Sequence, residues 1–411
     1  MTTLSAVARA ALPSANSSPP RIALVHDWLT GMRGGEKVLD ALCELFPDAP
    51  LWTLLSCPES VSPAIASRRI TTSWLQHLPL ARSKYRHYLP LFPLLSETTR
   101  VGPEDADIVI SSSHAVAKAM VRRCGRKPLH ICYIHTPMRY AWDRFDDYFG
   151  PQRVGRFLSR WFFRPVVKLL QKYDLATVHR VDVFCANSSF VAERVKRIYG
   201  RDALVVHAPI DVLRWQQVRR QPEDWYLMVS ALAPYKRVDH AIEACAALGR
   251  GLKIVGSGPE ERRLRAQAAQ LHANVEFLGF VSDEELANYY ARGRALLFPG
   301  VEDMGLVPLE AISSGCPVVA LAEGGVLDTM TAETAVFYQT PTAQGLKQAI
   351  VEFEGRPFDD EVLRIRARQF SRQKFQERFL RVLANAMKQE GYATAPSPEG
   401  DLAAAALESA R

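Results

Sequence analysis

No stretch of this sequence reaches the roughly 18 consecutive apolar residues that a membrane-spanning helix needs, so we predict no membrane span. The first 20 residues are rich in Ala, Ser and Pro, carry one charge at Arg9, and lack the long apolar centre of a secretory signal peptide. We expect residues 1–20 and 391–411 to be disordered tails. Without a secretory signal, the chain is expected in the cytoplasm.

Cysteine gives no sign of a disulfide framework or of a metal site. The seven cysteines are odd in number, have no C-x-x-C pair, and lie mostly in apolar runs. They are Cys43, Cys57, Cys124, Cys132, Cys185, Cys245 and Cys316. We therefore predict reduced thiols in the core and no bound metal.

The length and charge of the chain indicate two domains of different character. With 411 residues, 48% of them hydrophobic and 23% charged, the chain is typical of a soluble globular protein with two domains of roughly 150 to 200 residues. The net charge of +7 is uneven: residues 21–200 hold 26 Lys and Arg against 16 Asp and Glu, whereas residues 201–411 hold 24 against 28. A basic N-terminal half indicates an anionic partner, either a bilayer or a nucleic acid.

The N-terminal half alternates apolar runs with helical patterns. Buried strands are predicted at residues 21–26, 107–113, 129–135 and 181–189. After the first strand, the loop DWLTGMRGG leads into a helix. Gly34 and Gly35 lie where that helix begins, so their N–H groups form either an anion site at the positive end of the helix dipole or a tight turn without a ligand.

Two of these strands lead to a histidine. His114 follows the second strand, and we favour a structural role for it because a lone histidine is more often structural than catalytic. His135 ends the third strand and opens HTPMRYAWD, in which Arg139, Tyr140 and Trp142 gather at the same strand end.

A stripe of cations follows in RVGRFLSRWFFRPVVKLLQK. Its members are four residues apart and so share one helical face: Arg156, Arg160, Arg164, Lys168 and Lys172. Pro165 is expected to kink the run or to start a second helix. The stripe is either a solvated face over a packed core or, together with its aromatic residues and a second basic and aromatic segment at residues 81–95, an interfacial helix on an anionic membrane. We favour the membrane.

The C-terminal half predicts six units of strand and helix. The strands YLMVSAL, LKIVG, VEFLG, ALLFP, PVVAL and AVFYQ alternate with helices, which indicates a parallel sheet covered on both faces. Ser282 and Glu285 form a capping box at one helix. A polar linker between the halves gives domains at residues 21–212 and 213–355, followed by one charged helix at residues 356–390.

Two carboxylates in GVEDMGLVPLEAISSGCPVVAL suggest a sugar-nucleotide site. Glu302 lies at the end of a predicted buried strand, and Glu310 lies in the helix after it. Both are expected at the strand-end crevice where open α/β sheets bind ligands. A carboxylate accepts two hydrogen bonds from a vicinal diol, so one acid suits a ribose and the other suits a hexose. The alternative is a chance spacing of two glutamates.

The stretch from Glu302 through Glu310 to Val318 resembles the E-x7-E motif of the retaining glycosyltransferases of family 4. The resemblance covers roughly residues 21–388 and implies an α/β fold class with two Rossmann-like doubly wound domains facing a cleft (GT-B). The string HDWLTGMRGGEK further resembles a mannosyltransferase subgroup of bacterial surface-polysaccharide assembly. In GT-B proteins the C-terminal helix crosses back onto the N-terminal domain.

The resemblance also implies residue roles. It makes His135, Glu302 and Lys236 catalytic, with Lys236 stabilising the leaving diphosphate. The donor-binding residues that it implies are Gly34, Gly35, Lys236, Arg237, Gly256, Gly258, Glu302, Gly305, Leu306, Glu310 and Gly325. The cationic stripe, and not the resemblance, gives the predicted membrane and acceptor residues, which are Arg156, Arg160, Arg164 and Lys168. One position departs from the family: Ala231 stands where many members have an arginine, and Arg237 and Arg33 are the candidates to replace it.

We therefore predict a hexosyltransferase that needs neither a metal nor another cofactor. By resemblance, it moves mannose from GDP-mannose, with retention, to a lipid-linked glycan at the inner face of the cytoplasmic membrane. Nucleic acid is not expected as a partner, because no recognised binding motif accompanies the basic excess. The alternatives are a nucleotide-sugar epimerase on the same fold and a non-enzymatic basic adaptor for membrane or nucleic acid.

Overall fold

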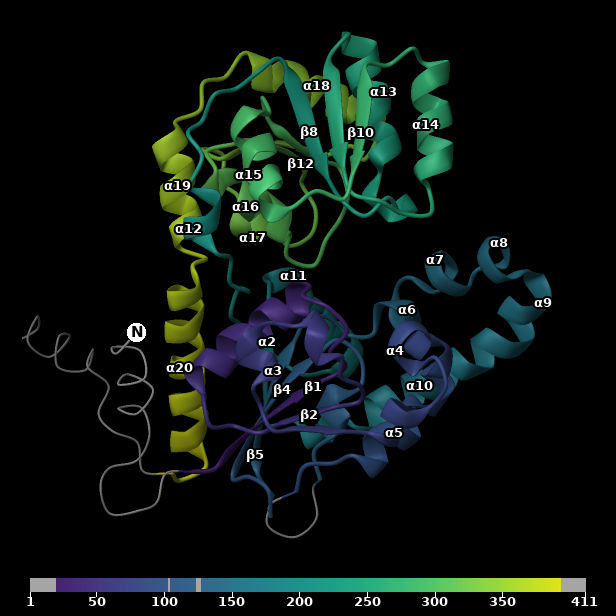
Figure 1. The fold of residues 1–411 in the computed structure, drawn as a ribbon, viewed down its shortest axis with the longest axis vertical. Coiled ribbons are helices and arrows are strands. Elements are labelled where there is room, and N and C mark those ends of the chain that lie inside the picture. Colours follow the sequence, from purple (N-terminus) through teal and green to yellow (C-terminus); the bar gives the residue numbers. More distant parts are fainter. Residues whose placement is uncertain (1–19, 103, 123–126, 393–411) are drawn as a thin grey trace, which may run out of the picture. The chain divides into compact units, whose positions relative to one another are not determined.

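The computed structural model describes residues 20–102, 104–122 and 127–392, so nearly all of the two expected tails, and Cys124, lie outside the described residues. The described chain divides into two compact units (Figure 1). Unit 1 holds the residues up to Ala186, Ala192–Val206 and those from Phe375 onward; unit 2 holds Asn187–Val191 and His207–Lys374.

Unit 1 is built on a seven-stranded parallel sheet in the order β3-β2-β1-β4-β5-β6-β7. The strands are β1 (Ile22–His26), β2 (Leu51–Thr53), β3 (Ile70–Thr72), β4 (Ile108–Ser113), β5 (Leu129–Ile134), β6 (Val183–Ala186) and β7 (Ala203–Val205). β4 and β5 are buried along their whole length, as expected for central strands covered on both faces. The sequence patterns predict β1, β4, β5 and β6, which are confirmed, but not β2 and β3, because three residues carry too little pattern.

Short helices connect most of these strands. The α-helices of unit 1 are α2 (Gly34–Leu45), α3 (Pro63–Ala66), α4 (Ala81–Lys84), α5 (Phe92–Thr98), α6 (Arg139–Trp142), α7 (Phe145–Phe149), α8 (Pro151–Val154), α9 (Arg156–Leu158), α10 (Arg164–Ala176), and most of α11 (Ser189–Tyr199) and α20 (Arg372–Gln389). Its 3-10 turns are η1 (Pro58–Ser60), η2 (Trp74–His77), η3 (Tyr85–Leu91), η4 (Ala117–Ala119) and η6 (Val178–Arg180).

A helical arm carries the cationic stripe. Figure 1 shows α7, α8 and α9 extending beyond the end of α10, away from the sheet of unit 1. Residues Ser159–Phe163 between α9 and α10 form a π turn, and Pro165 lies in the first turn of α10. The prediction that the five cations, spaced four residues apart, share one continuous helical face is wrong. A π turn is wider than an α-helical turn, so the cations that follow it point in a different direction from those before it. All five cations are nevertheless exposed.

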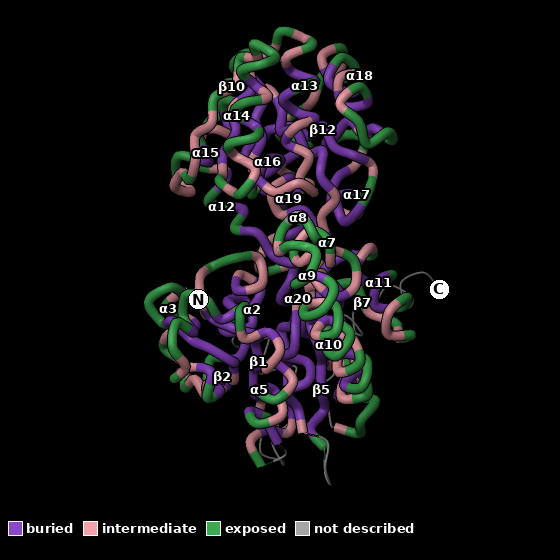
Figure 2. The backbone as a smooth tube through the Cα atoms, turned by 90° about the vertical axis from the view of Figure 1, so that its right-hand side faces the viewer, coloured by how far each residue is buried: buried purple, intermediate pink, exposed green. Residues whose placement is uncertain are grey.

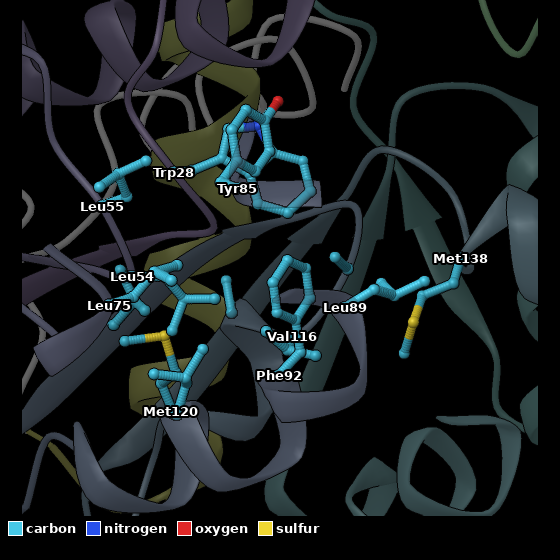
Figure 3. Packing of buried hydrophobic residues seen from close by; sticks show 14 of the residues in the cluster. Trp28, Leu54, Leu55, Leu75, Tyr85, Leu89, Phe92, Val116, Met120 and Met138 are labelled. Carbon is cyan, nitrogen blue, oxygen red and sulfur yellow. The ribbon is translucent and has the colours of Figure 1, made fainter. Parts of the chain in front are cut away.

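The second basic and aromatic segment, residues 81–95, does not present its aromatic side to solvent. Tyr85, Leu89, Phe92 and Leu95 are buried in the core cluster of unit 1, where Tyr85 packs against Trp28 (Figure 3). The prediction that this segment is interfacial is therefore wrong for its aromatic residues, since the core of unit 1 takes them up.

Unit 2 is built on a six-stranded parallel sheet in the order β10-β9-β8-β11-β12-β13. All six predicted strands are confirmed: β8 (Trp225–Val229), β9 (Gly251–Val255), β10 (Val275–Gly279), β11 (Leu296–Phe298), β12 (Val318–Leu321) and β13 (Ala335–Tyr338). Helices α13 (Val238–Leu248), α14 (Glu261–Gln270) and α18 (Ala343–Glu354) pack on one face through a shared apolar cluster. Helices α15 (Asp283–Arg292), α16 (Leu306–Ser313) and α19 (Asp360–Arg368) cover the other face (Figure 1).

The remaining elements of unit 2 are α12 (Val212–Trp215), η7 (Pro234–Lys236) and α17 (Val326–Thr329). The capping box at α15 is confirmed: the Ser282 hydroxyl accepts from the N–H of Glu285, and the Glu285 carboxylate accepts from the N–H of Ser282. The single charged helix predicted near the C-terminus is wrong. It is two helices, α19 and α20, because the hydroxyl of Ser371 accepts from the N–H of Lys374 and starts a new helix there. From Phe375 onward α20 belongs to unit 1, where Gln376 donates to the carbonyl of Ala41 at 3.2 Å.

The six cysteines of the described chain are buried and unpaired, as predicted: Cys43, Cys57, Cys132, Cys185, Cys245 and Cys316. Burial raises the pKa of these thiols, so they stay protonated. Among the helices of residues 20–102, 104–122 and 127–392, none is long and apolar enough to cross a membrane.

A buried ion pair joins the loop after β4 to α10. Lys118 is 1% exposed, and its Nζ lies 2.8 Å from Asp174 Oδ1 and 2.7 Å from the Asp174 carbonyl. The Asp174 carboxylate also accepts from Trp142 Nε1 at 2.8 Å and from the Tyr199 hydroxyl at 2.8 Å. These contacts compensate a charge that burial alone would make costly.

We expect Lys118→Met to lower the free energy of unfolding by about 3–5 kcal/mol, because it leaves the buried Asp174 carboxylate without its cation. Urea denaturation measures the change. The matched control is Lys127→Met, which removes a half-exposed lysine 3.2 Å from Asp182 and should cost at most about 1 kcal/mol. Equal losses in the two variants would contradict the importance of the buried pair.

Candidate functional site

In unit 2, the candidate groups lie where the strand order reverses. The sheet places β8 beside β11, and open parallel sheets bind ligands outside the carboxyl ends of strands at such a switch point. Lys236 ends the turn η7 in the loop after β8, and Glu302 lies in the loop after β11. Their side chains are largely buried and form an ion pair between Lys236 Nζ and Glu302 Oε1. The structure thus brings two of the predicted catalytic residues together.

Glycines allow the loops around this pair to touch through their backbones. A Cβ on Gly258 would lie 2.5 Å from the carbonyl oxygen of Leu232, and one on Gly256 would lie 2.0 Å from a backbone oxygen at the end of β8. A Cβ on Gly300 would lie 3.0 Å from the Cα of Lys236. The loops after β8, β9 and β11 therefore pack as one layer at the carboxyl edge of the sheet.

Gly325 ties the loop after β12 to the same layer. Its N–H donates to the carbonyl of Glu302 at 2.9 Å, and a Cβ there would lie 2.2 Å from the carbonyl oxygen of Asp303. The helix that follows, α17, is a single turn in which Asp328 accepts from the N–H of Ser189 at 2.6 Å. These contacts fix the backbone that presents Glu302.

Glu310 lies beneath this layer, in the second turn of α16. It is buried, and its Oε2 accepts a hydrogen bond from the hydroxyl of Tyr290 on α15 at 3.3 Å. Burial first, and then the charge of Glu310, raise the pKa of Tyr290 well above its usual value, so the phenol remains a donor. Gly305 caps the N-terminus of α16 with a φ of +77°, and Leu306, its first residue, is partly exposed.

Arg237 is engaged with the first turn of α13. Its Nε lies 3.3 Å from Asp239 Oδ1, and its Nη2 contacts His240 Nε2. Burial, and next the cation of Arg237, lower the pKa of His240, so the imidazole is neutral. Arg33, the other candidate to replace the missing arginine at Ala231, is an exposed residue of unit 1 that precedes α2.

In unit 1, three histidines gather at the corresponding switch point between β1 and β4. His26 ends β1, His114 follows β4 and His135 follows β5. The ring centroids are 5.9 Å apart for His26 and His114 and 6.1 Å apart for His114 and His135. A Cβ on Gly35 would lie 3.5 Å from His135 Nε2 and 3.5 Å from His26 Cε1, so the first turn of α2, which begins at Gly34, approaches two of the three rings.

Two buried carboxylates accompany the histidines. Asp27 is fully buried and accepts from the N–H groups of four successive residues, 114–117, at 2.6 to 3.0 Å. Glu36 lies with its Oε1 4.0 Å from His26 Nε2, and its Oε2 accepts from the N–H of Arg33 at 3.1 Å. Both nitrogens of the His26 ring are buried without a hydrogen-bond partner among the described residues.

Burial controls the protonation of this cluster. It lowers the pKa of His135 well below its usual range, with His114 and His26 adding to the effect. It also lowers the pKa of His114, against the opposing attraction of Asp27. Burial alone would raise the pKa of Glu36. The interactions of its carboxylate with His26 and with a backbone N–H stabilise the ionised form more strongly, so the net pKa of Glu36 is lowered. His114 and His135 are therefore neutral, and Glu36 is ionised, near pH 7.

The sequence patterns miss Asp27, Glu36 and His26 and give His114 only a structural role. Asp27 and His114 are 87 residues apart, and their contact depends on β1 and β4 being neighbours, which sequence spacing does not show. The sequence feature that could have identified Asp27 and His114 is that each directly follows a predicted strand. Within the described ranges, no group of three or more His, Cys, Asp or Glu side chains is arranged to hold a metal ion.

Comparison with known proteins matches part of the chain to a family. Residues 209–373, which lie in unit 2, match the family model described as Glycosyl transferases group 1. This confirms the resemblance for the part of the chain that holds Lys236, Glu302 and Glu310.

Two curated relatives are mannosyltransferases. One, from Corynebacterium glutamicum, is a GDP-mannose-dependent monoacylated alpha-(1-6)-phosphatidylinositol monomannoside mannosyltransferase, 29% identical over 43% of this chain and 54% of its own length. The other is the human alpha-1,3/1,6-mannosyltransferase ALG2, 24% identical over 62% of this chain and 66% of its own. The chain thus spans about half to two thirds of the length of these relatives.

A solved structure supports the fold. The Anabaena protein HepE in complex with UDP has a TM-score of 0.63 and 15% identity, and the match covers 89% of this chain and all of HepE. At that identity the likeness concerns the fold alone. The predicted architecture of two parallel-sheet α/β domains is confirmed, and the match to the family model lies in unit 2.

Proposed function

We propose that this protein, which carries a Glycosyl transferases group 1 domain at residues 209–373, is a hexosyltransferase that uses a nucleotide sugar as donor. The observation that carries the proposal is the largely buried ion pair of Lys236 and Glu302 at the switch point of that domain. An ammonium there can stabilise the charge that develops on a leaving diphosphate, while a carboxylate accepts from sugar hydroxyls.

We infer mannose from GDP-mannose, transferred with retention, as the specific reaction. The relative from Corynebacterium is named as GDP-mannose-dependent, and ALG2 is named as a mannosyltransferase. Neither relative favours the alternatives of an epimerase or a non-enzymatic adaptor. The other residues that the sequence analysis assigns to donor binding are likewise proposed to contact the nucleotide sugar. They are Gly34, Gly35, Arg237, Gly256, Gly258, Gly305, Leu306, Glu310 and Gly325.

We also propose a lipid-linked glycan as acceptor, with unit 1 bound at the inner face of the cytoplasmic membrane. The name of the Corynebacterium relative includes a phosphatidylinositol mannoside, which is a lipid. In unit 1, Phe157 is 74% exposed and Trp161 is 65% exposed, and Leu158 and Phe162 are about half exposed. Figure 2 shows α9 in the colour of exposed residues. These apolar side chains therefore do not form a packed core under the cations, and the arm has the composition of an interfacial helix.

The donor proposal predicts that Glu310→Gln weakens nucleotide-sugar binding by about 1–3 kcal/mol, because the amide replaces one acceptor oxygen with a donor. A thermal-shift screen against GDP-mannose, UDP-glucose and ADP-glucose identifies the ligand that raises Tm, and calorimetry then compares the affinities. The matched control is Glu284→Gln on the exposed first turn of α15, which should bind as the wild type does. Unchanged affinity in Glu310→Gln would refute the assignment of Glu310 to the donor, and a screen without any stabilising nucleotide sugar would refute the function.

Lys236→Ala should lower kcat by about 10²- to 10³-fold, because the lysine charge matters most as the diphosphate leaves. Arg237→Ala should have a milder effect, since its guanidinium is engaged with Asp239 and His240. Steady-state kinetics measure both, with thermal unfolding as the check on folding. Equal rates for the wild type and Lys236→Ala would exclude the proposed role, and an equal loss in Arg237→Ala would assign the diphosphate contact to both residues.

The membrane proposal predicts salt-sensitive binding of the protein to anionic vesicles. Each cation near an anionic surface contributes about 1 kcal/mol, and salt screens that attraction. Replacing Arg156, Arg160 and Arg164 by Glu should release the protein from vesicles of anionic phospholipid in a flotation assay. The control replaces Arg262, Arg263 and Arg265 on exposed α14 by Glu and should float as the wild type does. If the arm variant still floats, or if the wild type never does, the stripe is a solvated face.

A further inference from the structure

The carboxylate of Glu310 has a hydrogen-bond partner on a neighbouring helix to which the sequence patterns assign no role. This partner is Tyr290 on α15, whose hydroxyl lies 3.3 Å from Oε2 of Glu310 on α16. Tyr290 is fully buried, whereas Glu310 keeps 6% of its surface exposed. The phenol therefore meets the carboxylate from the interior of unit 2, and a ligand can reach Glu310 from the solvent side.

The direction of this hydrogen bond is fixed. Burial, and then the charge of Glu310, raise the pKa of Tyr290 well above its usual value, so the phenol keeps its proton. An ionised carboxylate accepts hydrogen bonds and cannot donate them. The Tyr290 hydroxyl therefore donates to Glu310, and hydrogen bonds to a charged acceptor are among the stronger ones in proteins.

Aromatic packing holds the phenol ring in place. Trp215 on α12 meets the ring of Tyr290 edge to face, with ring centroids 5.6 Å apart and an interplanar angle of 83°. The hydroxyl of Ser313, in the last turn of α16, donates to the carbonyl of Val212 on α12 at 3.2 Å. Helix α12 therefore anchors both the ring that carries the donor and the helix that carries the acceptor.

The backbone is also fixed at both ends of the hydrogen bond. The carbonyl of Tyr290 accepts from Arg220 Nη1 at 3.1 Å. The carbonyl of Glu310 accepts from the N–H of Ser314 at 3.2 Å and from its hydroxyl at 3.3 Å. Because both helices are anchored, the hydrogen bond from Tyr290 restricts the rotation of the Glu310 side chain. An acceptor that is ordered before a ligand arrives loses less entropy on binding.

A carboxylate ordered in this way suits a vicinal diol. Its two oxygens offer about four acceptor sites, of which the hydrogen bond from Tyr290 uses one, and a diol needs two. In a nucleotide sugar, the vicinal diols belong to the ribose and to the hexose. In the proposed function, Glu302 accepts from hydroxyls of the transferred sugar, which leaves Glu310 for the ribose.

We propose that Tyr290 is a positioning residue that holds Glu310 in the conformation that accepts from both ribose hydroxyls, and that it thereby selects ribonucleotides over 2′-deoxyribonucleotides. The proposal rests on the hexosyltransferase function above and names the residue that sets the preference for a ribonucleotide donor. All of these groups lie in unit 2, so binding of the nucleotide alone tests the proposal. Because Tyr290 is fully buried, it acts through Glu310, and its effect depends on the presence of the diol.

The experiment measures nucleotide binding to the full chain by calorimetry. The probes are GDP, UDP and ADP, and the 2′-deoxy form of whichever binds. Tyr290→Phe removes the hydroxyl alone and keeps the ring against Trp215. We expect the affinity for the ribonucleotide to fall by about 5- to 20-fold, and that for the 2′-deoxyribonucleotide by less than about twofold. The control is Tyr289→Phe on the same helix, which keeps a ring that packs against Trp225 and should change neither affinity.

A double-mutant cycle identifies the residue through which Tyr290 acts. Glu310→Gln should lower the affinity for the ribonucleotide, and adding Tyr290→Phe should lower it no further. A second variant, Trp215→Phe, loosens the ring of Tyr290 but keeps its hydroxyl, and it should weaken binding of the ribonucleotide alone. Additive losses, or equal losses for the two nucleotides, would show that Tyr290 acts on the fold and would overturn the proposal.

The outcomes also separate this proposal from the function on which it rests. The role of Tyr290 is overturned, and the hexosyltransferase proposal stays intact, if the wild type binds a ribonucleotide no more tightly than its 2′-deoxy form. The same holds if Tyr290→Phe binds as the wild type does. A folded wild type that binds none of the nucleoside diphosphates and none of the nucleotide sugars of the screen overturns both proposals. Thermal unfolding of each variant checks folding.

Discussion

Every strand in both units runs parallel to its neighbours, and the placement of the chemistry depends on this constraint. Parallel strands end at the same edge of a sheet, so the polar residues that follow them meet there even when the chain between them is long. In unit 1 the edge gathers His26, Asp27, His114 and His135. In unit 2 it gathers Lys236 and Glu302, together with the glycine loops that let their backbones approach. In open parallel sheets, the point where the strand order reverses is where such groups meet a ligand.

Each switch point holds a carboxylate, fully buried for Asp27 and largely buried for Glu302, but the two charges are stabilised differently. Asp27 is compensated by a neutral imidazole and by four backbone N–H groups, and these N–H groups cannot move without breaking the turn after β4. Glu302 is compensated by the flexible side chain of Lys236. A carboxylate held by backbone suits a positioning role, because its partners are rigid. A carboxylate paired with a lysine suits ligand exchange, because an ammonium carries three donors that it can share with an incoming phosphate.

The sequence predicts the strands that position the site better than it predicts the contacts within it. The six strands of unit 2 could be predicted because each is a short apolar run followed by turn residues and a helical pattern, and the structure confirms all six. Three-residue strands such as β2 carry no such pattern. The basic arm was recognised from spacing, but the π turn before Pro165, which the four-residue spacing does not reveal, changes the face of the cations after it. The pairing of Asp27 with His114 follows from strand order alone, which no local pattern contains.

Ala231 stands where many members of the resembled family have an arginine, and this makes the ion pair of Lys236 and Glu302 more important for binding a diphosphate. Arg237, the nearest candidate to replace the arginine, directs its guanidinium at Asp239 and His240. In this loop, Lys236 is then the cation that remains for a diphosphate, and its charge is already shared with Glu302. If the protein binds a nucleotide sugar as proposed, a phosphate that takes hydrogen bonds from the Lys236 ammonium would weaken the ion pair with Glu302. The carboxylate oxygens of Glu302 would then be free to accept from the hydroxyls of the sugar attached to that phosphate. On this proposal, one ion pair couples the binding of the two halves of the donor: a free diphosphate would leave Glu302 without a partner, whereas the intact donor would satisfy both groups.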